Sequence, residues 1–278
     1  MILKRKLINN LSLIFCTLTA LWGLFWLFFI IIDVIRHGLV ALTPTLLLND
    51  PSPPGVPGGG LKHAIIGHLL ITLCATLLGV PIGILGGTFL AEYGRNMRLS
   101  KVISFLADIM VSIPAIIVGA FIYALLVKPM GHFSGLAGGI ALAIIMIPVI
   151  IRTTENMLSL IPWSLREAAF ALGAPYYKVI FQVVYRGAGA GIFTGVILAI
   201  ARVTGEAAPL LFTSFNNAFT SYNLFQPMAS LTVTIFQYAM GPYEDWHKQA
   251  WGASFLITLV ILFLSIVGRY LIKRRFRD

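Results

Sequence analysis

The chain has 278 residues, of which 58% are hydrophobic and only 11% are charged. Soluble domains carry about 25% charged residues, so this composition excludes a soluble protein and indicates a polytopic membrane protein. The net charge of +10 does not indicate nucleic-acid binding, because the basic residues flank apolar runs. Cys16 and Cys74 both lie inside apolar runs, which argues against a disulfide framework or a metal site.

The first 62 residues predict an anchor helix followed by a loop. Three basic residues, 4–6, precede an apolar run at 11–32. This run resembles the start of a signal peptide, but it is too long and no small-residue cleavage site follows. We therefore expect residues 1–33 to be a retained anchor helix. Residues 34–62 contain a dense Pro and Gly cluster and predict an irregular loop outside the membrane.

Five further apolar runs are long enough to cross a bilayer, which takes about 18 residues or more. They predict spans at about 64–91, 102–127, 134–151, 187–212 and 251–270. With the anchor helix they make an all-α integral membrane fold of six transmembrane helices. Three polar segments complete the chain, at 152–186, 213–250 and 271–278. In 213–250, apolar residues recur at helical spacing, which predicts a helix against the outer face.

The basic residues set the predicted orientation. Six spans place both termini on one side of the membrane. Fifteen of the 20 Lys and Arg residues flank that side, and only four flank the other. Because positive residues accumulate on the cytoplasmic side, both termini and the segment 152–186 are predicted to be cytoplasmic. The loops 34–62 and 213–250 are then periplasmic, and the protein is expected in the inner (plasma) membrane.

A short helix is predicted in the middle of the cytoplasmic segment, over residues 164–173 (SLREAAFALG). Ser164 followed by Glu167 is a capping box, in which each side chain binds the other residue's backbone N–H. Gly173 suits the left-handed position that ends helices, and Pro175 prevents continuation. A helix of about two turns, ~12 Å long, is not stable alone in water. Contacts elsewhere must therefore hold it.

The spacing of Glu167, Ala168, Ala169 and Gly173 resembles the EAA loop of ABC-importer permeases. Longer runs, at 90–95, 152–173 and 199–213, resemble the phosphate-uptake (Pst) permeases, and in particular one of the two permease subunits of that system. The resemblance implies the type I ABC-importer permease (MetI-like) fold, in which the EAA loop forms a coupling helix that docks on a cytoplasmic ATPase. The implied coupling residues are Ser164, Glu167, Ala168, Ala169 and Gly173. The chain departs from the family at 183–186, where VVYR replaces the usual Ile-x-Leu-Pro.

The resemblance also implies partners: a PstC-type permease subunit, two PstB-type ATPase subunits and a periplasmic phosphate-binding protein. The sequence holds no Gly-rich phosphate loop of the Walker type, so ATP is expected on the partner ATPase and no cofactor on this chain. The five His residues are scattered without a metal-binding spacing. We therefore expect a transport subunit that is not itself an enzyme.

Arg202 and Glu206 are the unusual residues of the fifth span. They lie four residues apart in an apolar run, and therefore on one face of the expected helix. Small residues at 187, 191, 195 and 199 fall on the same side and would allow another helix to approach closely. The two charges can form an internal ion pair that locks two helices, or they can line the pathway of an anionic solute. We predict the second role for both residues.

Asp108 and the Ser112-Ile113-Pro114 sequence mark the third span. Asp108 lies about two turns into the span and is expected close to the cytoplasmic interface. Pro114 predicts a local kink, and the carbonyl that it frees needs a hydroxyl or another neighbour as a partner.

The sequence thus favours a permease subunit of an ATP-driven phosphate importer. Three alternatives remain: a permease for another small anion, a secondary transporter driven by an ion gradient, and a membrane scaffold or sensor in which Arg202 and Glu206 are only structural. A secondary transporter is expected to show inverted repeats and discontinuous helices, and no convincing repeat is present in the sequence.

Overall fold

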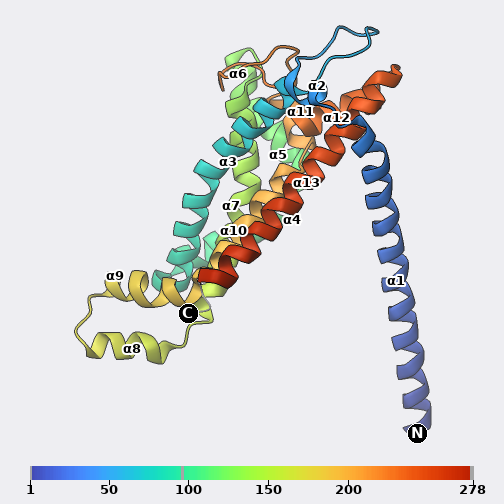
Figure 1. The fold of residues 1–278 in the computed structure, drawn as a ribbon. Helices are drawn as coiled ribbons and strands as arrows, with labels where there is room; N and C mark the ends of the chain where they lie inside the picture. The colour runs from blue at the N-terminus through green and yellow to red at the C-terminus, as the bar shows by residue number, and fades with distance from the viewer. Residues whose placement is uncertain (1, 95–96, 276–278) are drawn as a thin grey trace.

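The computed structural model describes residues 2–94 and 97–275, and within these ranges the chain forms helices and no strand (Figure 1). Five helices are long and apolar enough to cross a membrane. A sixth span results if the bent pair Arg98–Ser112 and Ala115–Met130 is counted as one. The predicted all-α membrane fold is confirmed.

The helices fall into long spans and short connecting helices. The long helices are α1 (Ile2–Ala41), α3 (Lys62–Thr88), α4 (Arg98–Ser112), α7 (Gly135–Ser159), α10 (Tyr185–Thr204) and α13 (Glu244–Arg275). The short helices are α2 (Pro44–Leu48), α5 (Ala115–Ile122), α6 (Lys128–Met130), α8 (Trp163–Ala171), α9 (Tyr176–Lys178), α11 (Ala208–Thr213) and α12 (Leu231–Ala239). Three π-helical segments continue α3, α5 and α9: η1 (Phe89–Tyr93), η2 (Tyr123–Val127) and η3 (Val179–Val184).

Helix α7 is the centre of the bundle, with α3 and α10 packed against it. Glycines make both contacts close. A Cβ added to Gly83 of α3 would lie 2.6 Å from Ile150 Cβ, and one added to Gly191 of α10 would lie 2.7 Å from Met157 Cγ. The predicted close approach through the small residues of the fifth span is therefore confirmed, and α7 is the helix that approaches.

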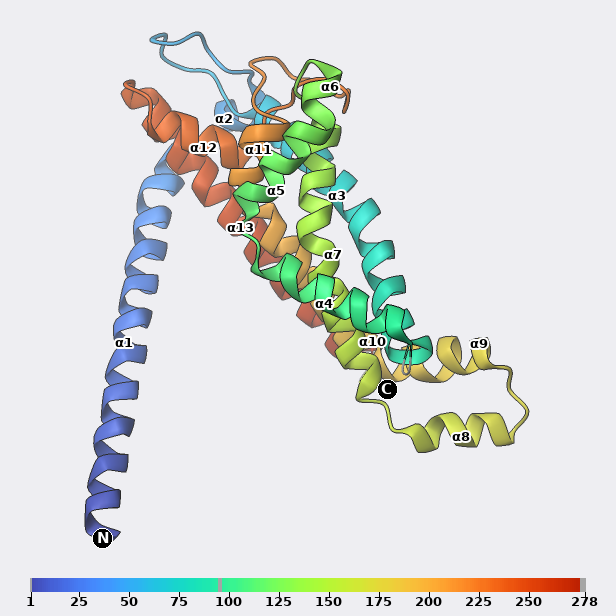
Figure 2. The same cartoon turned by 180° about the vertical axis from the view of Figure 1, so that it is seen from behind.

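Both views place the polar segments at two opposite ends of the bundle (Figures 1 and 2). One end holds the N-terminus, α8, α9 and the C-terminal end of α13. The other holds α2, α6, α11, α12 and the irregular loops that join them. The segment predicted to be cytoplasmic thus lies at the same end as the two termini.

Helix α1 leans away from the rest of the bundle (Figure 2). It meets α13 only near its C-terminal end, where the His37 ring stacks on Trp251 at 4.8 Å between centroids and Gly38 lies against Phe255. None of its most apolar 18-residue stretch is buried. A long apolar helix surface is therefore bare in the single chain.

The expected loop at 34–62 is wrong in its first part. Helix α1 continues to Ala41, and α2 follows at Pro44–Leu48. Thr43 explains this second helix, because its hydroxyl accepts a hydrogen bond from the Leu46 amide at 3.3 Å, and Pro44 suits the first helical position. Apart from the short connection at 42–43, the irregular part is residues 49–61, where the Pro and Gly residues concentrate.

Other boundaries also differ from those predicted. The outer helix in 213–250 exists but begins only at Leu231, after Ser230 caps it by accepting from the Val233 amide, and α13 already begins at Glu244. The basic tail expected at 271–278 starts as helix, since α13 reaches Arg275, and its last three residues lie outside the described ranges. Arg95 of the motif at 90–95 also lies outside them.

Candidate functional site

The short helix predicted in the cytoplasmic segment is α8, which projects from the end of the bundle beside α9 (Figure 1). Gly173 has a φ of +80°, as predicted for the residue that ends it. The Gly173 amide donates to Phe170 O at 2.9 Å, and the Ala174 amide donates to Ala169 O at 3.1 Å. This pair of bonds is a Schellman motif, which satisfies carbonyls at the helix end.

The predicted capping box is wrong. Pro162 occupies the N-cap position, no side chain caps the helix, and Ser164 lies in its first turn. The proline explains the shift: its fixed φ of −60° with extended ψ sets the chain for a helix that starts at the next residue. The Glu167 carboxylate is therefore not used for capping. Glu167 and Ala168 are exposed, and Ala169 is half-buried.

Arg166 is the only residue of α8 that is buried. Its guanidinium forms a two-pronged ion pair with Glu92 of η1, with Nη2–Oε1 at 2.5 Å and Nε–Oε2 at 3.2 Å. It also donates to two carbonyls at the end of α7, Ile161 O at 2.7 Å and Leu158 O at 3.1 Å. The side chains of Arg166 and Glu92 are only 5% and 1% exposed. One side chain thus joins α8 to the ends of α3 and α7.

Tyr176 adds a second connection at the start of α9. Its hydroxyl donates to Glu92 O at 2.8 Å, and its ring stacks on Phe170 of α8 at 5.8 Å between centroids. From Tyr176 the chain runs through η3 and α10 to Thr204 as one apolar helical span. The contacts that hold α8 therefore also hold the start of the span that ends near Arg202.

Arg152 ties α4 to α7 on the same side of the bundle. Its guanidinium pairs with Asp108 at 2.5 Å and with Glu155 at 2.7 Å, and it donates to Ser104 O at 2.7 Å. Asp108 is thus part of a structural pair. The Ser112 hydroxyl donates to Asp108 O at 3.0 Å, which is a bond within the last turn of α4.

The third span is broken in its middle, and the fifth is broken toward the end of the bundle opposite to α8. Helices α4 and α5 meet at 105° around Pro114, a much larger bend than the predicted local kink. The fifth span, expected to be continuous over 187–212, stops at Thr204 and resumes as α11 at Ala208. Helices α5 and α11 then cross so closely that a Cβ on Gly119 would lie 2.6 Å from Pro209 Cα.

The break separates the predicted pair Arg202 and Glu206. Arg202 lies in the last turn of α10, whereas Glu206 lies outside any helix, so the two do not share one helical face as predicted. Gly205 favours this end of α10, and Pro209 cannot donate the backbone bond that would continue it. Within the described residues neither side chain has a hydrogen bond or ion pair. Arg202 is exposed on the single chain, and Glu206 is half-buried.

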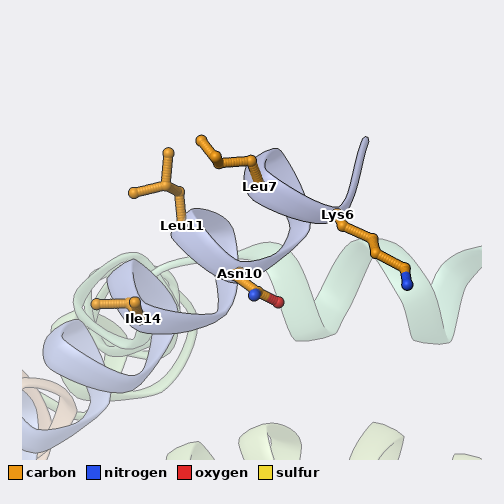
Figure 3. Close-up of a pocket in the computed structure, with 5 residues that line it drawn as sticks. All are labelled: Lys6, Leu7, Asn10, Leu11 and Ile14. Carbon is orange, nitrogen blue, oxygen red and sulfur yellow. The ribbon is translucent and has the colours of Figure 1, made fainter. Parts of the chain in front are cut away.

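Two hollows on the surface do not make an anion site. One, of about 320 Å³, is lined by Lys6 and four other residues of α1, so no second element closes it (Figure 3). Another, of about 490 Å³, lies at the end of the bundle opposite to α8 and is lined by residues such as His63, Tyr238 and Trp246. Burial raises the pKa of Tyr238, and among the described residues neither Lys nor Arg lines this second hollow.

Comparisons with known proteins place the chain in a family. The profile of the binding-protein-dependent transport system inner membrane component matches residues 79–277. The chain is 51% identical to the phosphate transport system permease protein PstA of Pasteurella multocida, over 95% of this chain and 94% of that protein. The chain belongs to this family of transport permeases. It is also 46% identical to PstA of Yersinia pestis, over 98% of this chain and 92% of that protein.

The fold of the family agrees with the structure. A solved structure of the MetNI methionine ABC transporter in an inward-facing conformation has a chain that superposes with a TM-score of 0.61, at 21% identity, over 78% of this chain and 94% of that one. The predicted MetI-like permease fold is confirmed. As a permease of this family, the chain is a transport subunit and a multi-pass inner membrane component that works with other components of an ABC transporter.

Sequence reasoning missed Glu92 and Arg166, the best-buried charges of this permease. In the sequence, Glu92 belongs only to the run at 90–95, and Arg166 counts only among the basic residues that set the predicted orientation. Their separation of 74 residues gives no local pattern. A weak signal existed: Arg166 is the one cation within the short apolar helix, and such a helix needs an external contact.

The ion pair predicts an asymmetric response to substitution. Glu92→Leu leaves Arg166 buried and unpaired, which should lower the free energy of unfolding by about 3–5 kcal/mol. The double change Arg166→Met with Glu92→Leu removes both charges at similar volume and should cost much less. Thermal unfolding of the purified permease in detergent measures both effects. The single change Arg166→Met completes the comparison. If the double variant loses as much stability as Glu92→Leu and Arg166→Met lose together, the two side chains do not stabilise each other.

Proposed function

We propose that the chain is one of two permease subunits of an ATP-driven ABC importer that moves inorganic phosphate into the cytoplasm. The observation that carries this proposal is the 51% identity with a PstA phosphate permease over nearly the whole of both chains. The exposed helix α8, with the Glu-Ala-Ala sequence on its surface, supports it. ATP is bound by the partner ATPase, and this chain binds no cofactor.

The proposed partner in the membrane is a PstC-type permease. The bare surface of α1 supports this, because an apolar helix this long needs lipid or another subunit along its side. Helices α4 and α5 also present exposed apolar side chains, such as Ile113, Ile117 and Phe121. Two PstB-type ATPases on the cytoplasmic side and a periplasmic phosphate-binding protein complete the proposed complex.

The proposed orientation places both termini, α8 and α9 in the cytoplasm. The excess of Lys and Arg on that side of the sequence supports it. With this orientation α8 faces the ATPases, and the irregular loops at 49–61 and 214–230 face the binding protein. Closure of the ATPases on ATP then moves the docked α8, and phosphate released outside enters the pathway between the two permeases.

Arg202 is the proposed phosphate contact in that pathway. A lone Arg deep in a bilayer costs about 2.5–3.5 kcal/mol on insertion scales, so its presence calls for a function. Its guanidinium has no partner among the described residues and is exposed on the single chain. A guanidinium can bind two phosphate oxygens at once. Glu206 lies at the adjacent break and is proposed to line the same pathway.

One observation favours a different class. The breaks at Pro114 and at Gly205 are the discontinuous helices expected of a secondary transporter. The family match is instead to components of binding-protein-dependent systems, and we therefore favour the ATP-driven importer. A single Arg also suits sulfate or another small anion, so the choice of phosphate rests on the relatives.

Reconstitution tests the proposed function. Proteoliposomes that hold this chain, a PstC-type permease and the PstB-type ATPase should take up labelled phosphate only with ATP on the ATPase side and binding protein on the other. Vesicles with this chain alone, under a proton or sodium gradient, are the matched control. Uptake by the chain alone would support the secondary transporter. Equal uptake of sulfate through a sulfate-specific binding protein would contradict phosphate selectivity in the permease.

Glu167 tests the docking of α8. Glu167→Lys reverses the charge that α8 offers to the ATPase. We expect normal amounts of permease in the membrane but a loss of ATPase on co-purification. The exposed Lys178→Glu is the control, because it also changes charge by two on neighbouring α9. Full ATPase recovery and uptake with Glu167→Lys would rule out docking through this residue.

Arg202 tests the pathway. Arg202→Gln should abolish phosphate uptake, and Arg202→Lys should impair it strongly, while the assembled complex is recovered in normal amounts. The outer Lys128→Gln, also exposed, should leave uptake unchanged. The decisive variant is Arg202→Leu with Glu206→Leu, because it removes both charges together. Normal uptake by that protein would show that neither charge contacts the substrate.

A further inference from the structure

We infer that Arg166 and Glu92 are positioning residues for energy coupling: their buried ion pair makes α8 move as one body with the cytoplasmic ends of α3 and α7. The inference rests on the proposed function, because it concerns how motion of a docked helix reaches the membrane spans. On this inference, Arg166 and Glu92 transmit the motion of α8 to the membrane spans, although neither side chain faces the ATPase.

The first support is the directionality of the contacts. An apolar helix on an apolar surface can slide, since the hydrophobic effect has no direction. Arg166 instead makes hydrogen bonds to Glu92 and to the carbonyls of Leu158 and Ile161. Glu92 continues the end of α3, Leu158 lies in the last turn of α7, and Ile161 lies in the connection between α7 and α8, so α8 cannot rotate or shift without breaking charge-assisted bonds.

The second support is burial. With side-chain exposures of 5% and 1%, water cannot easily replace the bonds that a sliding α8 would break. The other charged pairs around the same end are more open: Asp108, paired with Arg152, has a side chain that is 66% exposed. Among the described ion pairs, the Arg166–Glu92 pair is therefore the best suited to transmit force without yielding.

The third support is where the motion leads. Tyr176 holds Glu92 through its hydroxyl and begins a helical span of 29 residues. The first part of this span, α9 with η3, lies across the end of the bundle, and α10 rises from it (Figures 1 and 2). Arg202 lies in the last turn of α10. The pair therefore fixes α8 to the segment that leads into α10, and the far end of α10 presents the proposed phosphate contact.

The test compares transport with ATP hydrolysis in the reconstituted complex. Arg166→Met with Glu92→Leu leaves the exposed docking residues of α8 in place and leaves no charge unpaired. We expect the ATPase to co-purify and to hydrolyse ATP, while the phosphate transported per ATP hydrolysed falls by about 2- to 30-fold. Lys178→Met, an exposed cation on α9, should keep the ratio of the unchanged complex.

A second variant covers the case in which the double change fails to assemble. Arg166→Lys keeps the charge opposite Glu92 but cannot reproduce the set of bonds to Glu92, Leu158 and Ile161. It should lower the same ratio by a smaller factor at a normal amount of complex. An unchanged ratio in either assembled variant would overturn the inference. Absence of ATP-driven uptake in the unchanged complex would instead overturn the proposed function, so the two failures are distinct.

Discussion

The end of this permease that carries α8 and α9 depends on one buried guanidinium. A helix of two to three turns has no stability of its own in water, and α8 exposes nearly all of its surface. Its position is set by Arg166, which is bound to Glu92 and to two carbonyls at the end of α7. The Schellman turn at Gly173 then reverses the chain so that Tyr176 also reaches Glu92. Helix α8 projects from the bundle, but these contacts fix it to the spans formed by α3, α7 and α10.

In the rest of the bundle, the close packing of the helices depends on glycine residues at the contacts. Glycines of α3 and α10 let both helices approach α7 at distances that a methyl group would block. Such approach gives van der Waals contact in a bilayer, where apolar side chains gain little by leaving lipid. At the end of the bundle opposite to α8, Gly119 of α5 likewise lets this helix approach Pro209 of α11 closely. Prolines end the continuous spans there, and a glycine lets the resulting short helices cross.

The sequence predicts the spans well and their details poorly, for physical reasons. Hydropathy reports which stretches prefer lipid, and it predicts the spans. Helical spacing of apolar residues predicts the helix in 213–250, and the tolerance of glycine for positive φ predicts the end of α8 at Gly173. Hydropathy does not report where a helix stops inside an apolar run. The prediction that Arg202 and Glu206 share one helical face is wrong, because α10 ends at Thr204, between the two residues, where Gly205 and Pro209 follow. The prediction of a capping box is wrong because the N-cap of α8 is Pro162, two residues before Ser164. The pair of Arg166 with Glu92 joins residues 74 positions apart, and no local pattern encodes such a contact.

Two features of the single chain agree with the proposed assembly. Among the described residues, the Arg202 side chain has no partner and is exposed on the surface of the bundle, and most of the length of α1 is bare. Lipid can cover α1, but it cannot satisfy an exposed guanidinium at depth, which needs protein, water or an anion. On the proposed function, a second permease covers α1 and encloses Arg202 at the same time. The pathway then forms only on assembly, and an isolated subunit has no closed route through which phosphate could leak.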